Sequence, residues 1–245
     1  QLGRAVDAGF NLDKVMNQGF DCAFIAMGLP ESKTLHLNGK PKGLWGALEF
    51  LGALKHGRDV NVAGKRVAVI GGGNTGMDVA NAAKEQGATS VYMICFESFI
   101  TMPAWMHERQ HTLTEDVSFM NQFMPKGYVV NDGRVKAVKA THVNLAEPDE
   151  NGFRAPIEIA GANLEVEVDV IIEALGQKAP DNLKDILPGV ELNKKNLVAV
   201  KRGSLATSRA GVFAGGDIIN GGLMVVTAVA DGMKAADEIN KFLKS

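Results

Sequence analysis

Six consecutive residues carry the strongest chemical signal in the sequence, Gly71-Gly72-Gly73-Asn74-Thr75-Gly76. Their glycines follow the G-x-G-x-x-G spacing, in which Gly71 permits a tight turn, Gly73 lets a pyrophosphate approach the backbone, and Gly76 lets a helix pack closely on a strand. Free amide groups at the start of that helix would face the anion. We therefore predict a dinucleotide-binding turn. Four neighbours are further candidate binding residues: Gly72, Asn74, Thr75 and Asp78.

The segments around this turn are the elements that such a site needs. Residues 65–70 are rich in β-forming side chains, a helix is predicted from about residue 75 to 86, and residues 90–96 form the next strand. Asn74 and Thr75 are expected to cap the helix. The alternative is that the glycines only form a tight turn and bind no nucleotide. Spacing, strand, helix and second strand agree, however, and favour a Rossmann-like unit.

Glu97 is the candidate residue for discriminating between NAD(H) and NADP(H). It lies 26 positions after Gly71 (97 minus 71), just past the second strand, where folds of this type place a residue that meets the adenosine ribose. A carboxylate accepts hydrogen bonds from ribose hydroxyls and repels a 2′-phosphate at short range. We therefore expect NAD(H) to be favoured over NADP(H). A solvated glutamate in a loop is the alternative, because the loop length is uncertain.

The remaining chain predicts an α/β protein with two kinds of sheet. An apolar run at residues 21–28 predicts a buried strand, and residues 44–54 predict a helix that ends before a domain boundary. Strand-like runs follow at residues 129–130, 135–145, 157–159 and 164–175, and the Asp132-Gly133 turn suggests an antiparallel β-meander. A helix of small and apolar residues is expected at about residues 225–243.

At four places the sequence resembles the glutamate synthase small-subunit family of FAD-dependent pyridine nucleotide oxidoreductases. Residues 69–78 are similar to the family's nicotinamide-binding motif, and residues 24–28 to the strand before that domain. Residues 174–177 resemble the return crossing. Residues 211–217, followed by 225–232, resemble the carboxy-terminal flavin motif. The resemblance covers about residues 20–243.

The resemblance implies a nicotinamide-binding domain inserted in a partial FAD-binding domain. We expect residues 1–59 and 176–245 to form the FAD-binding part and residues 60–175 the NAD(P)-binding domain. The family's first glycine motif and its cysteine-rich iron-sulfur segment have no counterpart here, so we expect another segment or chain to supply them. By resemblance, Asp217 hydrogen-bonds the flavin's ribityl or phosphate portion and Thr227 lies beside its ring. Three glycines complete the implied cofactor set: Gly28, Gly176 and Gly216.

One departure from the family concerns the nicotinamide cofactor. Relatives that use NADPH usually carry two arginines after the second strand, whereas this sequence has Phe96-Glu97. The departure agrees with the carboxylate argument for NAD(H).

Composition excludes several other classes. The formal net charge of −2 and the absence of long basic blocks argue against nucleic acid and anionic membranes as partners, and no apolar run approaches the ~18 residues of a membrane span. Cys22 and Cys95 form no Cys-x-x-Cys pair, which fits a cytoplasmic setting. His107 and His111 satisfy H-E-x-x-H, but a charged Arg109 lies between them. We expect surface histidines and no metal site.

The sequence therefore predicts a flavin-dependent NAD(P)H oxidoreductase subunit that passes electrons from NADH through FAD to an iron-sulfur or large catalytic subunit. No catalytic side chain is assigned, because direct hydride transfer depends on orientation more than on an acid or base. The alternative is a non-catalytic NAD(H)-binding module without flavin. The final electron acceptor stays open.

Overall fold

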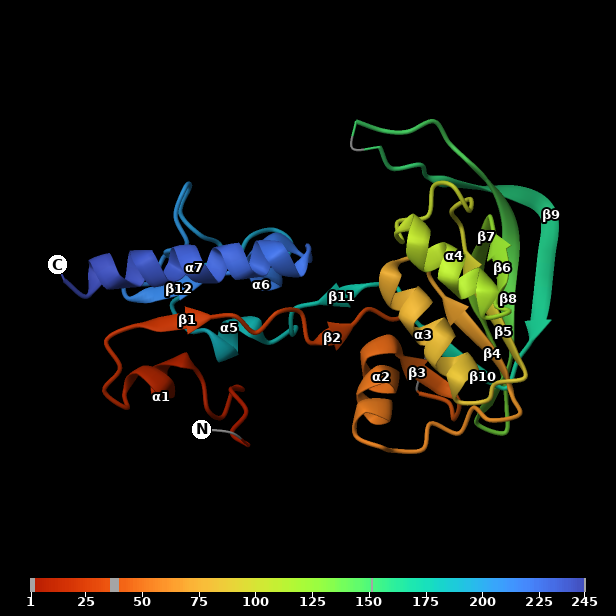
Figure 1. The fold of residues 1–245 in the computed structure, drawn as a ribbon, viewed down its shortest axis with the longest axis horizontal. Coiled ribbons are helices and arrows are strands. Elements are labelled where there is room, and N and C mark those ends of the chain that lie inside the picture. Colours follow the sequence, from red (N-terminus) through yellow and green to blue (C-terminus); the bar gives the residue numbers. More distant parts are fainter. Residues whose placement is uncertain (1–2, 36–39, 151, 245) are drawn as a thin grey trace. The chain divides into compact units, whose positions relative to one another are not determined.

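The computed structural model describes residues 3–35, 40–150 and 152–244, and the chain divides into two compact units (Figure 1). Unit 1 joins both ends of the chain, residues 1–31 and 177–245, whereas unit 2 is the continuous segment 32–176. Two short strands, β2 (Glu31–Ser32) and β11 (Gln177–Lys178), pair where the chain passes from one unit to the other. The mixed α/β fold expected from the sequence is confirmed.

Unit 2 is built on a five-stranded sheet in which every described pairing is parallel. In spatial order the strands are β3 (Leu44–Gly46), β10 (Val170–Glu173), β4 (Arg66–Ile70), β5 (Ser90–Cys95) and β6 (Ser118–Asn121). Parallel sheets are covered on both faces, so their central strands are almost continuously apolar. The central strand β4 follows this rule, because four of its five residues are buried.

Alternate side chains of β4 enter two separate cores. Val67 and Val69 pack against α2 (Ala47–Lys55) and α3 (Asn74–Glu85), beside which α4 (Met106–Thr114) lies. Ala68 and Ile70 face the opposite core, which includes Val138 of the antiparallel sheet. Helices and antiparallel sheet thus lie on opposite sides of the parallel sheet (Figure 1). The antiparallel strands are β7 (Phe123–Asn131), β8 (Arg134–Leu145) and β9 (Pro156–Glu167).

The antiparallel meander is present, but its last expected strand is divided. Residues 164–167 belong to β9, whereas Val170–Glu173 form β10 in the parallel sheet. Asp169 marks the change, because both its backbone amide and its carboxylate bond to Arg66 at the start of β4. An apolar run alone does not distinguish a meander strand from a parallel one.

The division into units also differs from the expected boundary at residues 59 and 60. Strand β3 pairs with β10, and α2 packs against α3, so residues 44–55 belong to unit 2. At the other end, unit 2 stops at Gly176, next to the expected boundary.

Unit 1 is a smaller assembly around a parallel pair of strands. Strand β1 (Ala23–Ile25) pairs with β12 (Val212–Ala214), although they are almost two hundred positions apart. Ile25 and Ala214 share a core with Ile218. The helices are α1 (Leu12–Met16), α5 (Leu183–Ile186), α6 (Asp217–Asn220) and the long α7 (Val225–Phe242).

Candidate functional site

The Gly71 turn leaves β4 and leads into α3, as predicted. Gly71 has φ of +121°, and a Cβ added there would lie 2.4 Å from the carbonyl oxygen of Ala174. A Cβ on Gly76 would lie 2.5 Å from the carbonyl oxygen of Gly71. Both distances are too short for any side chain, so these two glycines are needed by the fold itself.

Gly73 differs from them, because it has open space where a Cβ would stand. No atom lies within 4 Å of that position, and the residue has ordinary extended backbone with φ of −88°. The protein therefore has room for a side chain at Gly73. A glycine is required at this position only if a bound ligand approaches the backbone closely.

The start of α3 offers unpaired backbone amides. Within the described residues, the amides of Gly73, Asn74 and Thr75 have no hydrogen-bond acceptor. The first turn of α3 contains no acidic side chain that could compete for them. Free amides and the positive end of the helix dipole together attract an anion. The turn has the chemistry to hold a pyrophosphate.

The expected caps of this helix are wrong. The N-cap residue is Gly73, and no side chain caps the helix. Instead, Asn74 Oδ1 accepts a hydrogen bond of 2.8 Å from the backbone amide of Trp105. The side chain thereby ties the turn to the start of α4, and the amides at the helix start stay open. Asp78 lies farther along α3, beyond the turn, and its pKa is raised by partial burial and by the nearby Glu108 carboxylate.

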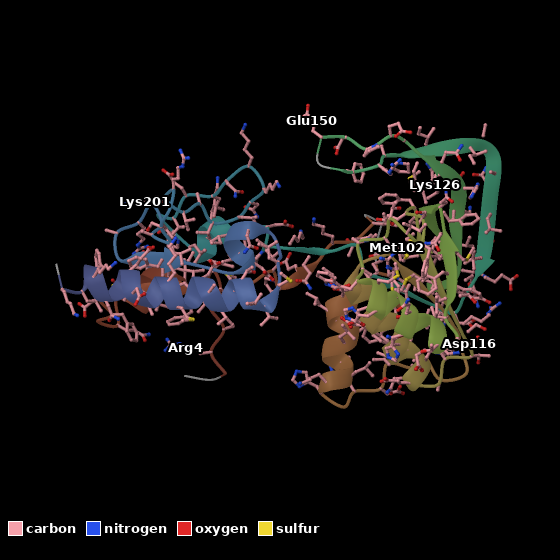
Figure 2. The ribbon with its side chains drawn as sticks, turned by 45° about the horizontal axis from the view of Figure 1, so that its top comes forward. Arg4, Met102, Asp116, Lys126, Glu150 and Lys201 are labelled. Carbon is pink, nitrogen blue, oxygen red and sulfur yellow. The ribbon has the colours of Figure 1, made fainter. Side chains whose placement is uncertain are left out.

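Two side chains form a floor beneath Gly72, and a third, Asn121, bonds to both of them. A Cβ on Gly72 would lie 3.1 Å from Met102 Cε and 3.3 Å from Cys95 Sγ, and Figure 2 labels Met102 in this unit. Asn121 Nδ2 donates to Met102 Sδ at 3.3 Å and to Cys95 Sγ at 3.4 Å. Burial raises the pKa of the Cys95 thiol to about 12. Cys95 is therefore a neutral packing group at ordinary pH.

Glu97 is held mainly through its backbone. Its carbonyl oxygen accepts hydrogen bonds of 3.1 Å from Asn121 Nδ2 and 3.1 Å from the Gln122 amide. The side chain is half-buried, and this burial raises the pKa of its carboxyl. It is thus less readily ionised than the solvent-facing carboxylate that we expected to select NAD(H).

Sequence reasoning did not identify Asn121, although it links the ends of two neighbouring strands. It is the last residue of β6 and bonds to the loop after β5. The carboxyl ends of parallel strands carry the binding residues in open α/β sheets. That rule points to Asn121 once β6 is recognised, but residues 118–121 give little strand signal.

In unit 1, the structure brings Gly28, Gly216 and Asp217 together. They line a cavity of about 230 Å³ together with Phe24 and the start of α7. Gly216 has φ of +75°, and its amide donates to Asp231 on α7 at 2.9 Å. Asp217 Oδ1 accepts a hydrogen bond of 3.1 Å from the Leu223 amide. The turn is thus held in place by protein contacts.

The other two residues implied in unit 1 are placed differently. Thr227 lies in the first turn of α7, where its hydroxyl bonds back to the Met224 carbonyl, and it does not line the cavity. Gly176 lies in unit 2, and its carbonyl accepts a hydrogen bond of 2.9 Å from the Lys33 amide. Asp231, which lies within residues 225–232, fixes the Gly216 backbone, a role that the sequence did not predict.

The H-E-x-x-H histidines lie on the surface of α4. The imidazoles of His107 and His111 are well exposed, and they lie 3.3 Å from Glu108 and 3.9 Å from Glu115, respectively. Across residues 3–35, 40–150 and 152–244, no group of three or more His, Cys, Asp or Glu side chains is arranged to hold a metal ion. In the same ranges, no helix combines the length and apolarity that a bilayer span requires.

Comparison with protein families gives a match along most of the chain. The model of the pyridine nucleotide-disulphide oxidoreductases covers residues 6–232. Solved structures agree on the fold: T. acidophilum thioredoxin reductase has a TM-score of 0.71 at 22% identity, over 91% of this chain and 66% of that one. Mycobacterium tuberculosis FprA in complex with NADPH also has a TM-score of 0.71, at 15% identity, over 94% and 65%.

Curated relatives confirm the resemblance to glutamate synthase small subunits. The glutamate synthase [NADPH] small chain of Escherichia coli is 33% identical over all of this chain and 55% of its own length. The NADP(+)-dependent formate dehydrogenase subunit beta of Moorella thermoacetica is 35% identical over 99% and 34%. The NADPH-Fe(3+) oxidoreductase subunit beta of Geobacter sulfurreducens is 33% identical over 94% and 38%. The chain thus spans between a third and somewhat over half the length of these relatives.

These names correct the expected cofactor preference. All three relatives are named for NADPH or NADP(+), so the expectation that NAD(H) is favoured over NADP(H) is wrong. The expectation depended on a solvent-exposed Glu97 carboxylate facing the ribose, whereas the Glu97 side chain is half-buried.

The family match, the parallel sheet with its glycine turn, and the paired strands of unit 1 all lead to one assignment. The chain belongs to the pyridine nucleotide-disulphide oxidoreductase family.

Proposed function

We propose that unit 2 binds NADPH, with its pyrophosphate at the turn from Gly71 to Gly76. The observation that carries this proposal is the open space at Gly73 beside three unpaired amides. The names of the relatives support NADPH as the nicotinamide cofactor. Arg109 is buried, and its guanidinium donates to the carbonyls of Phe99 and Ile100, so it helps to hold the loop after β5 in place.

On this proposal the dinucleotide-binding residues come from the Gly71 turn and from the loop after β5. Gly72, Asn74 and Thr75 offer backbone to the phosphates, and Glu97 and its loop border the adenosine end. Asn121 is a positioning residue, because it holds the loop after β5 against the floor of the turn. Asp78 lies beyond the turn and contributes to α3 instead.

Unit 1 is proposed to hold part of an FAD. Gly28, Gly216 and Asp217 line its cavity, and Thr227 lies in the first turn of the adjoining α7. The volume of about 230 Å³ is below the ~300–1,000 Å³ of ordinary ligand sites. The cavity therefore fits one portion of FAD, and further contacts must come from elsewhere. On this proposal, residues 1–31 and 177–245 are flavin-binding and residues 32–176 are NADPH-binding.

The proposed activity is that of a flavin-dependent NADPH oxidoreductase subunit. FAD would supply the ability to accept a hydride and release electrons one at a time. The chain's own residues bind and orient the two cofactors, which is what direct hydride transfer requires. Because relatives are named as small or beta subunits, the proposed recipient is an iron-sulfur or large catalytic subunit.

The Gly73→Ala variant tests the NADPH site. The new methyl group meets no protein atom, so the melting temperature should stay within a few degrees of wild type, whereas NADPH affinity should fall roughly tenfold to a hundredfold. Gly52→Ala is the matched control, since it also adds a methyl group in open space, on α2. Isothermal titration with NADPH and NADH measures both variants. Unchanged NADPH affinity in Gly73→Ala would exclude this turn as the pyrophosphate site.

Absorbance spectroscopy tests the flavin proposal. The chain reconstituted with FAD should show flavin bands that bleach when NADPH is added without oxygen. Asp231→Ala, which frees the Gly216 amide, should weaken FAD retention and leave NADPH binding unchanged. A colourless protein that still binds NADPH would favour the simpler alternative, a nucleotide-binding module without flavin.

A further inference from the structure

A cavity in unit 2 lies at the end of the parallel sheet opposite the Gly71 turn. Strands β3, β4 and β10 are parallel and begin at Leu44, Arg66 and Val170, so the segments that lead into them gather at one edge. A cavity of about 760 Å³ opens there. The Gly71 turn follows the other end of β4, so the two sites are separate.

The wall of this cavity is fixed by backbone contacts. The hairpin turn between β7 and β8 docks on the lead-in to β3: the Lys42 amide donates to the Gly133 carbonyl at 2.8 Å, and the Val135 amide donates to the Lys42 carbonyl at 3.1 Å. Gly43 allows the close approach, because a Cβ there would lie 2.8 Å from Val135 Cγ2 of the hairpin and 2.8 Å from the Asp169 carbonyl oxygen. Lys42 and Arg134 are therefore held side by side, although they are distant in sequence.

The charge on the wall is strongly one-sided. Five cations and two acids line the cavity, for a net charge of +3 (5 minus 2), whereas the whole chain carries −2. Both acids are already paired: Glu49 lies 2.6 Å from Lys40, and Asp169 lies 3.2 Å from Arg66. In the described part of the chain, four cations of the wall form no ion pair: Lys42, Lys65, Arg134 and Lys136.

We propose that this cavity binds a small polyanion of the phosphate class, carrying two or more negative charges. Its volume falls within the ~300–1,000 Å³ of small-molecule sites. Arginine pairs with phosphate oxygens through two parallel hydrogen bonds, and lysines add point charges. Trp45 provides an apolar wall for a ring or chain attached to the phosphates. An acidic protein segment is the rival occupant, and the test includes it.

Amide-resolved NMR with inorganic pyrophosphate tests this proposal on the full chain. The protein is first saturated with NADP(+), so that phosphate binding at residues 71–76 is suppressed. Pyrophosphate should then cause saturable shifts at residues 42–45 and 134–136. In the double variant Lys42→Gln/Arg134→Gln, the dissociation constant should rise about tenfold or more. Lys42 bonds through its backbone, which the substitution keeps.

A matched control removes two positive charges elsewhere. Lys201 and Arg202 lie on an exposed loop of unit 1, where Figure 2 labels Lys201. Lys201→Gln/Arg202→Gln should leave the dissociation constant unchanged. If the Lys42/Arg134 variant unfolds, the single variant Lys65→Gln replaces it, because Lys65 lines the cavity from another strand lead-in.

Several results would overturn the proposal. These are chemical-shift changes that do not saturate with pyrophosphate, chemical-shift changes confined to residues 71–76, and an equal rise of the dissociation constant in the Lys201→Gln/Arg202→Gln control. A glutamate-rich peptide that binds at residues 42–45 while pyrophosphate does not would show that the cavity receives an acidic protein segment. Because shifts are read residue by residue, failure of NADPH binding at Gly71 leaves this result interpretable.

Discussion

Asn121 shows how a single amide can organise a binding loop. Its Nδ2 lies within 3.1–3.4 Å of the Glu97 carbonyl oxygen, Cys95 Sγ and Met102 Sδ. Cys95 and Met102 form the floor of Gly72, and Glu97 lies in the loop after β5. The Asn121 amide therefore connects two segments that a bound dinucleotide would contact, and Asn121 need not contact the dinucleotide directly.

Asn121→Leu should affect both stability and binding. It keeps the side chain's approximate size and removes its hydrogen bonds, so the free energy of unfolding should fall by about 1–2 kcal/mol. NADPH affinity should fall about tenfold, because the loop after β5 loses its position. Thr141→Val is the matched control, since it removes a buried hydroxyl that bonds to the Ala162 carbonyl within the antiparallel sheet. Equal NADPH affinity in both variants would contradict the positioning role.

The two cysteines should react very differently with thiol reagents. Burial raises the pKa of Cys95 to about 12, and Cys95 lies beneath Gly72, whereas Cys22 is partly exposed. Only the thiolate reacts, so alkylation of Cys95 should become appreciable only as the pH rises toward 12. At pH 8, iodoacetamide followed by mass spectrometry should label Cys22 first, and Cys95 only after unfolding. Rapid labelling of Cys95 in the folded protein would contradict this burial.

At the scale of elements, the sequence predicts the strand-turn-helix-strand unit well, because local signals agree there. Residues 67–70 are apolar, Gly71 and Gly76 stand where the fold leaves no room for a Cβ, and the next strand starts at Ser90 as expected. The Asp132-Gly133 turn is also found, with Asn131 opposite Arg134. Each of these features depends on residues close together in sequence.

Features set by distant contacts were not predicted. The division between β9 and β10 depends on Asp169 meeting Arg66, about a hundred positions away. The inclusion of β3 in unit 2 depends on its pairing with β10. Asn121 and the basic cavity likewise arise only when strands that are far apart in sequence are placed side by side. The half-burial of the Glu97 side chain was not predicted for the same reason, since it is set by tertiary packing.

The contact between Arg66 and Asp169 should make stability depend on pH. The hydrogen bonds from Arg66 lower the pKa of Asp169, so its ionised form stabilises the fold above the ordinary aspartate pKa of about 3.9. This contribution is lost as the pH falls from there through the lowered folded-state pKa. Asp169→Asn should lower the free energy of unfolding by about 0.5–1 kcal/mol at pH 7, a small effect because the ion pair is partly exposed.

Urea unfolding at pH 7 and pH 3 measures this prediction. The difference between wild type and Asp169→Asn should shrink at the lower pH. Glu158→Gln is the control. Glu158 forms an exposed ion pair with Lys126, which Figure 2 labels, whereas the Asp169 carboxylate also accepts a hydrogen bond from the Arg66 backbone amide. The effect of Glu158→Gln at pH 7 should be smaller. A difference for Asp169→Asn that stays constant with pH would exclude charge as the cause.

At the scale of the whole molecule, the order of the chain separates the two proposed cofactor sites. Residues 32–176 form one continuous unit, and the flanking segments on both sides form the other. The Gly71 turn lies in the first, and the cavity of Gly28, Gly216 and Asp217 lies in the second. Each cofactor should therefore stabilise its own unit.

Hydrogen exchange on the whole chain tests this separation. A ligand at a hundred times its dissociation constant stabilises the unit that binds it by about 2.7 kcal/mol, which slows exchange through local unfolding about a hundredfold. NADPH should protect residues 72–77, and FAD should protect residues 215–217 and the first turn of α7. In Gly73→Ala, protection by NADPH should be lost while protection by FAD persists. If NADPH instead protected residues 215–217, the assignment of the two cofactors to separate units would be wrong. The start of α3, with its open amides, would then not be the site that binds the pyrophosphate of NADPH.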